Sequence, residues 1–222
     1  MTPNRPRTLV LVSGTGTEVG KTWWSSAMAQ ALRSRGLSVA ARKPAQSFYP
    51  DDTTTDAAVL GGATGEDATT VCAPHRWYEV AMAPPMAAVA LGRPGFSIAD
   101  LVNEITWPAD IDVGFIESAG GPRSPLADDG DTVALASALA PDLVVLVADA
   151  GLGTINAVRL ACDAFGTLAP NVAVPVVVVP IVVALNRYDD ALLLHRANRD
   201  WLEAGGFFVV TDPNALADRL AA

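Results

Sequence analysis

Short apolar runs alternate with segments of helical apolar spacing along most of this chain. Leu9–Val12 is a short β-branched run and Lys21–Arg35 repeats apolar residues at helical spacing, which predicts a strand, a loop and then a helix. Further strands are predicted over Val39–Lys43, Val113–Glu117, Leu143–Val147, Val174–Leu185 and Phe207–Val210. Further helices are predicted over Asp56–Leu60, a segment that starts at Ser97, Thr132–Leu139, Thr154–Leu168, Tyr188–Ala204 and Asn214–Leu220.

This alternation predicts an α/β fold. Continuous apolar strands separated by helices are typical of a mostly parallel sheet with helices on both faces, a three-layer αβα arrangement. The pair Gly61-Gly62 is expected to end its helix. The segment Glu66–Gly95 has weak periodicity and contains four prolines, so turns and one short helix are expected there. With no linker in the sequence, residues 1–222 are predicted to form a single domain.

Composition and charge narrow the classes of function. The chain of 222 residues carries 15 basic and 24 acidic groups, a formal net charge of −9, which argues against a nucleic-acid partner. Cys72 and Cys162 have no metal-binding or disulfide spacing, which favours a reducing cytoplasm. The apolar stretch Val172–Leu185 is short for a membrane span and contains Pro175 and Pro180, so no membrane segment is predicted.

The strongest chemical signal is Gly14–Thr22. It contains a complete GxxxxGK[ST] pattern between a predicted strand and a predicted helix, which is the context that a phosphate loop requires. In such a loop, backbone N–H groups bind phosphate oxygens, while Lys21 reaches the terminal phosphates and the Thr22 hydroxyl binds magnesium. A nucleoside triphosphate with Mg²⁺ is therefore the expected ligand, on a fold of the P-loop NTPase type.

Three more charged side chains are predicted at the same edge of the sheet. Lys43 ends one strand immediately before a proline, Glu117 ends another, and Asp56 begins a helix. Lys43 suits charge stabilisation of a transferred phosphoryl group. Magnesium prefers oxygen ligands, and the candidates are Thr22, Asp56 and Glu117, with Asp51 and Asp52 as alternatives to Asp56.

Five motifs occur in an order that is similar to one known family. They are the phosphate loop with Thr17-Glu18-Val19, Lys43-Pro44-Ala45-Gln46-Ser47, Asp56 before an apolar helix, Glu117-Ser118-Ala119-Gly120-Gly121, and Leu152-Gly153-Thr154-Ile155-Asn156. From about Leu9 to Asn186 the sequence resembles the ATP-dependent dethiobiotin synthetases. The resemblance implies an ATP- and Mg²⁺-dependent cyclo-ligase of biotin biosynthesis. Such an enzyme forms the ureido ring of dethiobiotin from 7,8-diaminopelargonic acid and CO2 through a carbamate and a carbamic-phosphoric anhydride. The family also implies a homodimer whose active site is partly completed by the second subunit.

The resemblance also implies roles for individual residues. The expected catalytic residues are Lys21, Lys43, Thr17 and Ser47. The expected nucleotide contacts are Gly16, Thr17, Glu18, Val19, Gly20, Lys21, Thr22 and, for the adenine edge, Asn186. The expected Mg²⁺ ligands are Thr22, Asp56 and Glu117, and the expected substrate contacts are Ser47, Gly120, Gly153 and Asn156. Asn156 lies at the start of a predicted helix, whose N-terminus favours anions, but simple capping of that helix is an equally good interpretation.

The sequence departs from the family pattern on the substrate side. The departures are Phe48 for a glycine, Ser118 for a glycine, Pro122-Arg123 for two apolar residues, and Ala157 for a histidine. The usual base-binding segment is not recognisable, although Asp212-Pro213 is a candidate, so the base preference stays open. Two alternatives therefore remain: a related P-loop ATPase with a regulatory or partner-binding role, and a ligase that acts on a different amine.

Overall fold

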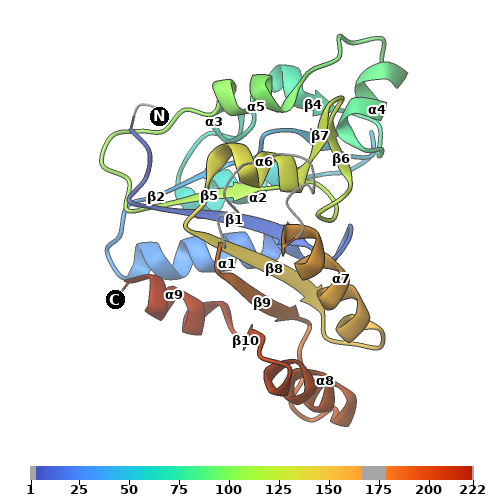
Figure 1. The fold of residues 1–222 in the computed structure, drawn as a ribbon. Coiled ribbons are helices and arrows are strands. Elements are labelled where there is room, and N and C mark those ends of the chain that lie inside the picture. The colour runs from blue at the N-terminus through green and yellow to red at the C-terminus, as the bar shows by residue number, and fades with distance from the viewer. Residues whose placement is uncertain (1–3, 167–178, 222) are drawn as a thin grey trace.

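The computed structural model describes residues 4–166 and 179–221 and contains a six-stranded sheet (Figure 1). The strand order is β10-β9-β8-β1-β5-β2, and all the pairings in it are parallel. The strands are β1 (Thr8–Gly14), β2 (Val39–Arg42), β5 (Val113–Glu117), β8 (Leu143–Asp149), β9 (Ile181–Asn186) and β10 (Phe208–Val210). Because the strands are parallel, the loops that follow β1, β2 and β5 meet at one edge of the sheet.

Helices cover both faces of the sheet, which confirms the predicted three-layer α/β architecture. One face is covered by α1 (Lys21–Ser34), α2 (Asp56–Thr64), α3 (Ala68–Val71) and α9 (Pro213–Ala221). The core of the other face includes residues of α4 (Pro84–Ala90), α5 (Ile98–Glu104), α6 (Thr132–Leu139), α7 (Thr154–Gly166) and α8 (Leu193–Ala204). Within the described part of the chain, no helix has the length and apolar character needed to cross a membrane.

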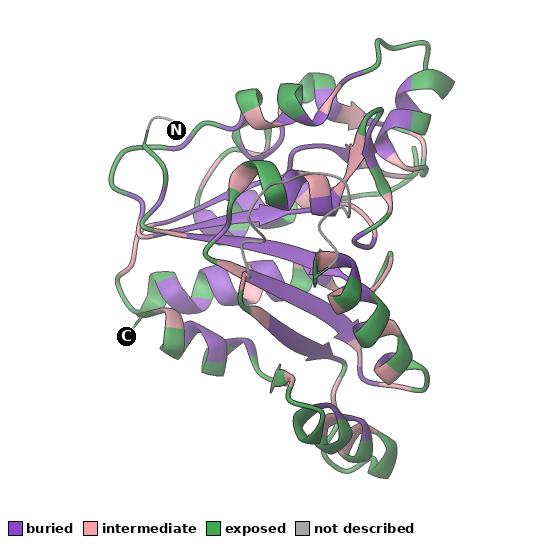
Figure 2. Ribbon diagram, viewed as in Figure 1, coloured by how far each residue is buried: buried purple, intermediate pink, exposed green. Residues whose placement is uncertain are grey.

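Alternate side chains of β1 pack into the cores on the two faces of the sheet. Val10 and Val12 pack on the α1 side with the fully buried Trp24, whereas Leu9 and Leu11 belong to the core on the opposite face. Successive residues of a strand point to opposite faces of a sheet. The strand is therefore buried on both sides (Figure 2), which explains its unbroken apolar sequence.

The predicted end of α2 at Gly61-Gly62 is wrong. The helix continues through both glycines to Thr64 and ends at Gly65, whose positive φ of 80° provides the left-handed C-cap. A Cβ atom on Gly61 would lie 2.6 Å from the carbonyl oxygen of Glu66. Gly61 therefore lets the chain fold back closely over α2 instead of breaking the helix.

The start of the penultimate helix is also corrected. The prediction began it at Tyr188, but α8 begins at Leu193. The Asp189 carboxylate accepts a hydrogen bond from the Ala191 backbone N–H at 2.8 Å, and the Asp189 N–H donates to Nδ1 of His195 at 3.0 Å. These local side-chain bonds stabilise a turn in competition with the helix.

The segment Glu66–Gly95 is more ordered than predicted. It holds α3, a short 3₁₀ turn at Pro74–Arg76, the strand β4 (Trp77–Tyr78) and α4, where one short helix was expected. Two prolines open α4, in positions where a helix loses no hydrogen bond to proline. The predicted strand Val174–Leu185 and the predicted helix end at Leu168 fall partly outside the described residues.

Two small strand pairs stand beside the main sheet, and the sequence did not predict them. β3 (Gln46–Ser47) pairs in parallel with β4, and β6 (Pro125–Ala127) pairs antiparallel with β7 (Gly130–Asp131). Figure 1 shows both pairs near α4, above the end of β1. These pairs bring residues that are distant in sequence, such as Ser47 and Pro125, to the same cavity as the phosphate loop.

Candidate functional site

The phosphate loop joins β1 to α1 at the edge predicted for it. Gly20 has a φ of 96° and Glu18 a φ of 59°, so the backbone of the loop is held in left-handed turns. The Lys21 ammonium donates to the carbonyl oxygen of Gly16 at 2.9 Å, within the same loop. No described side chain caps the N-terminus of α1. Such an N-terminus, with its partial positive charge, suits phosphate binding.

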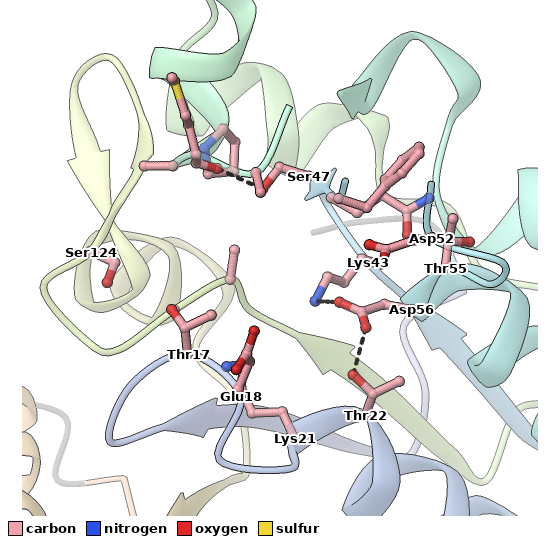
Figure 3. Close-up of a pocket in the computed structure, with 18 of the residues that line it drawn as sticks. Thr17, Glu18, Lys21, Thr22, Lys43, Ser47, Asp52, Thr55, Asp56 and Ser124 are labelled. Carbon is pink, nitrogen blue, oxygen red and sulfur yellow. Dashed lines mark hydrogen bonds and ion pairs between the residues drawn. The ribbon is translucent and has the colours of Figure 1, made fainter. Parts of the chain in front are cut away.

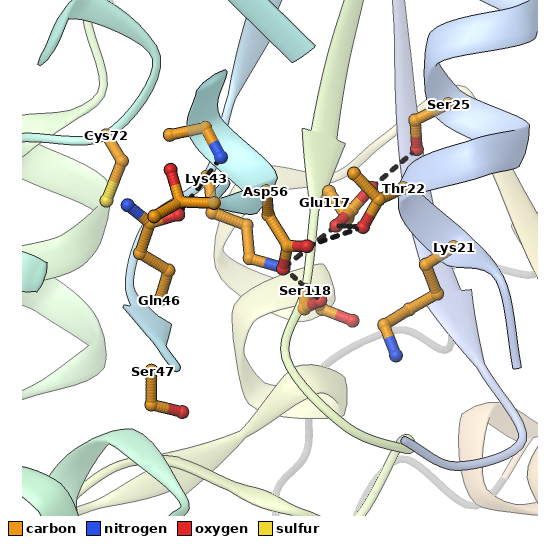
Figure 4. Close-up of polar contacts among 12 residues, drawn as sticks. Lys21, Thr22, Ser25, Lys43, Gln46, Ser47, Asp56, Cys72, Glu117 and Ser118 are labelled. Carbon is orange, nitrogen blue, oxygen red and sulfur yellow. Dashed lines mark hydrogen bonds and ion pairs between the residues drawn. The ribbon is translucent and has the colours of Figure 1, made fainter. Parts of the chain in front are cut away.

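The predicted metal ligands converge on one point at the start of α1 (Figure 4). The Thr22 hydroxyl lies 2.8 Å from Oδ1 of Asp56 and 2.9 Å from Oε1 of Glu117. Lys43 Nζ lies 2.6 Å from Oδ2 of Asp56 and 2.8 Å from the same Glu117 oxygen. The Ser25 hydroxyl donates to the other Glu117 oxygen at 2.8 Å. Two carboxylates and a hydroxyl are a donor set that suits Mg²⁺.

The charges of this cluster shift one another's titration. Burial acts to lower the pKa of Lys43, but Asp56 and Glu117 outweigh it and hold that pKa above its usual value. Burial acts to raise the pKa of Asp56, and the Lys43 charge reverses this effect and lowers the pKa. Burial and then the charge of Lys43 lower the pKa of Lys21 to about 8. Lys43 is therefore a firmly charged group, whereas no carboxylate in the described part of the chain forms an ion pair with Lys21.

A cavity of about 680 Å³ opens directly above this cluster (Figure 3). Thr17, Ser47 and Gly120 line it, as expected for substrate and catalytic residues, and the Ser47 hydroxyl donates to the carbonyl oxygen of Met82 at 2.6 Å. Its lining also includes Glu18, Gly20, Lys21, Thr22, Lys43, Gln46, Phe48, Tyr49, Asp52, Thr54, Thr55, Asp56, Ala81, Met82, Ala83, Pro84, Ala119, Ser124 and Pro125. The structure thus places the phosphate loop and the charged cluster on one side of a single cavity. A second wall, which includes Ser47, Tyr49 and Met82, lines the same cavity.

Asn186 lies at the end of β9, on the far side of the phosphate loop from Asp56. Its Nδ2 donates to the Val19 carbonyl oxygen at 3.0 Å, and a Cβ on Gly20 would lie 2.0 Å from the same nitrogen. The neighbouring Arg187 pairs with Asp149 at 2.9 Å and donates to the carbonyl oxygen of Glu18 at 3.3 Å. Asn186 therefore lies beside the loop, and its expected contact with the nucleotide stays a prediction.

Comparison with known proteins gives the same family by a separate route. A family model described as an AAA domain matches residues 8–199. The ATP-dependent dethiobiotin synthetase BioD of Rhodococcus erythropolis is 38% identical over 161 residues, which cover 71% of this chain and 69% of that protein. The chain belongs to the dethiobiotin synthetase family.

Other members of the dethiobiotin synthetase family match over similar lengths. The BioD protein of Caulobacter vibrioides is 37% identical over 76% of this chain and 78% of its own length, and that of Haloferax mediterranei is 40% identical over 69% and 64%. The chain therefore spans roughly two thirds to three quarters of these relatives. Among solved structures, the cell division protein FtsY of Thermotoga maritima aligns with a TM-score of 0.47 at 16% identity, over 100% of this chain and 70% of FtsY.

Two residues expected to contact substrate in this family do not line the cavity. Gly153 precedes α7 and Asn156 is an exposed residue in the first turn of that helix. The Ala157 N–H donates to the Gly153 carbonyl oxygen at 3.1 Å, so Gly153, rather than Asn156, occupies the N-cap position. The interpretation of Asn156 as a simple cap is therefore wrong.

The departures from the dethiobiotin synthetase pattern have clear places in the structure. Phe48 lies in the cavity wall with its ring packed edge-on against Trp77, and the cavity remains open beside it. Ser118 is fully buried, and its carbonyl oxygen accepts a hydrogen bond from Lys43 at 3.3 Å. Arg123 pairs with Asp131 at 3.1 Å and does not line the cavity. None of these side chains closes the space above the phosphate loop.

The structure also adds residues that the sequence interpretation missed. Ser25 bonds Glu117, and its spacing of three from Thr22 on a helix was a signal that it shares that face. The Gln46 side-chain oxygen accepts from the Ala57 N–H at 3.0 Å and so ties β3 to the start of α2. No pattern in the sequence joins Gln46 to Ala57.

Proposed function

We propose that this chain is an ATP-dependent dethiobiotin synthetase that closes the ureido ring of dethiobiotin from 7,8-diaminopelargonic acid and CO2. The observation that supports this best is the single cavity shared by the phosphate loop, Lys43 and the wall around Ser47. Phosphoryl transfer to a second substrate needs both reactants held in one space. A module that only binds and hydrolyses nucleotide has no need of the second wall.

The oxygen cluster at Thr22 supports Mg²⁺ as the metal cofactor. We assign the Mg²⁺ ligands to Thr22, Asp56 and Glu117, because the Thr22 hydroxyl lies 2.8 Å from an Asp56 oxygen and 2.9 Å from a Glu117 oxygen. A bound magnesium ion supplies charge neutralisation for the terminal phosphates of ATP. Asp51 does not line the cavity, and Asp52 does not contact Thr22 in the described contacts, which favours Asp56 as the ligand.

The reaction divides between the lysines and the hydroxyl groups. One amine of the substrate captures CO2 as a carbamate, whose oxygen attacks the γ-phosphorus of ATP, and the second amine then expels phosphate as the ring closes. Lys21 and Lys43 neutralise the charge on the phosphates and the carbamate, and Thr17 and Ser47 hold the carbamate and the amines. The protein makes no covalent bond, so positioning and charge stabilisation account for the catalysis. Glu18, the loop glycines and Asn186 hold the nucleotide.

A homodimer accounts for the two substrate residues outside the cavity. Gly153 and Asn156 lie near the N-terminus of α7. Leu152, just before the helix, and Leu160, within it, are apolar residues that are 92% and 61% exposed. We propose that α7 of one subunit contributes to the active site of the other. Sedimentation of the wild-type chain and of Leu160→Glu tests this; a monomeric wild type contradicts it.

The proposed activity is tested by direct product detection. Purified protein is incubated with 7,8-diaminopelargonic acid, bicarbonate and magnesium ATP, and dethiobiotin is measured by mass spectrometry beside Lys21→Ala. We expect product from the wild type only. Absence of product, with ATP binding intact, contradicts the proposal and favours a different amine substrate or a regulatory role.

A further inference from the structure

The cavity is lined by carboxylates that differ in what they contact. Asp56 lines the cavity and is ion-paired with Lys43, which also pairs with the buried Glu117. Asp52 lines the same cavity, but it forms no ion pair within the described part of the chain. Glu18 also lines the cavity, on the phosphate loop itself. Asp52 is thus a carboxylate in the cavity wall without an ion-pair partner among the described residues.

The local turn holds the Asp52 carboxylate in a defined position. The Asp52 N–H donates to the Tyr49 carbonyl oxygen at 3.0 Å, and the Tyr49 N–H donates back to Oδ2 of Asp52 at 2.9 Å. This pair of bonds leaves Oδ1 for another donor. Figure 3 shows Asp52 beside Thr55, on the same side of the cavity as Lys43 and Asp56.

The cavity that Asp52 lines also has apolar side chains in its wall, among them Phe48, Met82 and Pro84. A cavity that holds both a carboxylate and apolar side chains is complementary to an alkyl chain that carries an amine, because the carboxylate accepts the amine N–H bonds while the apolar wall covers the chain. Lys21 and Lys43, which line the cavity on the phosphate side, suit the anionic carbamate instead.

We propose that Asp52 determines specificity for a substrate with two amines. This rests on the proposed function, in which one amine becomes the carbamate that faces Lys43. Asp52 binds the second amine through its free Oδ1 oxygen and positions it beside the first. A substrate with a single amine gains nothing from this carboxylate.

Three variants test the role of Asp52. Asp52→Asn removes the charge and keeps the shape, and Asp52→Glu keeps the charge. Asp51→Asn is the matched control, because the Asp51 carboxylate is next in sequence but does not line the cavity. Loss of a hydrogen bond between charged groups predicts a KM for 7,8-diaminopelargonic acid raised by about 10- to 100-fold in Asp52→Asn. The KM for ATP stays within about two-fold, Asp52→Glu restores part of the loss, and Asp51→Asn matches the wild type.

The outcomes separate this proposal from the proposed function. If wild type makes dethiobiotin and Asp52→Asn leaves the KM for the diamine unchanged, or raises the KM for ATP equally, Asp52 has no such role. If wild type makes no dethiobiotin, calorimetric binding of 7,8-diaminopelargonic acid and of 8-aminononanoic acid to wild type and Asp52→Asn decides the question. Weakening of diamine binding alone supports the amine site, and equal affinities for the two proteins overturn it.

Discussion

The two walls of the cavity are built in different ways. On the phosphate side, Lys43 and Glu117 are almost completely buried, and their charged atoms are joined to each other and to Thr22 by contacts of 2.8 and 2.9 Å. On the opposite wall, Tyr49 is 57% exposed and Met82 is 46% exposed. The first wall is a buried charge network, whereas the second includes side chains that are about half exposed to solvent.

Under the proposed function, this difference separates the residues of the reaction from the residues that recognise the substrate. Buried, mutually bonded charges keep their geometry before the substrate arrives, which is what stabilisation of a transferred phosphoryl group requires. An exposed loop wall has few contacts to lose and so tolerates substitution. The departures at Phe48 and Ser118 follow this division, because Phe48 replaces a small residue on the loop wall, whereas Ser118 still offers its backbone carbonyl to Lys43.

Loss of the central cation gives the largest expected effect. Lys43→Ala should lower turnover by at least about 10²- to 10³-fold, because charge stabilisation of the transferred group is removed, while ATP affinity falls only a few-fold. The variant also leaves Glu117 buried without its cation, so the free energy of unfolding should fall by about 3–5 kcal/mol. Product formation, calorimetry with ATP and urea unfolding measure the three quantities.

The matched change on the other wall is Tyr49→Ala. Because Tyr49 is largely exposed, the free energy of unfolding of the Tyr49→Ala variant should stay within about 0.5 kcal/mol of that of the wild type. Equal destabilisation by the two variants would break the comparison between the walls, and unchanged turnover in Lys43→Ala would remove its catalytic role.

The metal site gives the next effect. Glu117→Gln replaces a carboxylate that faces Thr22 with a neutral amide, so the Mg²⁺ concentration for half-maximal activity should rise by about 10- to 100-fold. Titration of activity with Mg²⁺ at saturating ATP measures it, with Asp51→Asn as the unaffected control. A variant with wild-type magnesium dependence shows that Glu117 is not a ligand.

The rigidity of the phosphate loop is tested by two glycines. In Gly20→Ala the added Cβ meets Asn186 at 2.0 Å on a backbone with φ of +96°, whereas at Gly16 an added Cβ meets nothing within 4 Å. The left-handed backbone alone costs about 1–2 kcal/mol, so Gly20→Ala should lower the unfolding free energy of nucleotide-free protein by at least that amount. Gly16→Ala should leave it nearly unchanged; similar losses in both variants argue against the tight packing of Asn186.

The smallest effect is a proton taken up with the nucleotide. With a pKa of about 8, Lys21 is largely neutral above pH 8.5 in the free protein, and the phosphates of ATP raise its pKa again. Binding of metal-free ATP at pH 8.5 should therefore be accompanied by proton uptake, and affinity should weaken as the pH rises through 8. Calorimetry in buffers of different ionisation enthalpy measures the uptake, which Lys21→Arg should abolish because arginine stays charged.

Much of the fold could be predicted because its strands are long apolar runs. Leu143–Val147 and Val113–Glu117 are buried on both faces, so their sequences carry an unbroken signal. The pair of β3 with β4 could not be predicted, because each strand has two residues and their pairing joins Gln46 to Trp77 across a long intervening segment. The prediction at Gly61 was wrong because this glycine does not end the helix. It lets the Glu66 backbone approach α2 closely.

Some residues of the candidate site could be predicted from the sequence, and others could not. Lys43 and Glu117 could be placed near the phosphate loop from sequence, since the ends of parallel strands share one edge of the sheet. The role of Met82 in the second wall could not, because it depends on how α4 and β4 return over the loop. For Gly153 and Asn156, the sequence identified the helix start but not its distance from the cavity.

The C-terminal helix has a consequence for how the protein is made. Leu216 and Ala217 of α9 belong to the same core as Met28 of α1, and Arg35 pairs with Asp218 at a separation of 183 positions. At translation rates of about 5–20 residues per second, the helix that carries the phosphate loop waits roughly 10–40 seconds for its cover. During that interval the face of α1 that will receive α9 is uncovered. Chaperones that bind apolar segments can then bind to this face of the nascent chain.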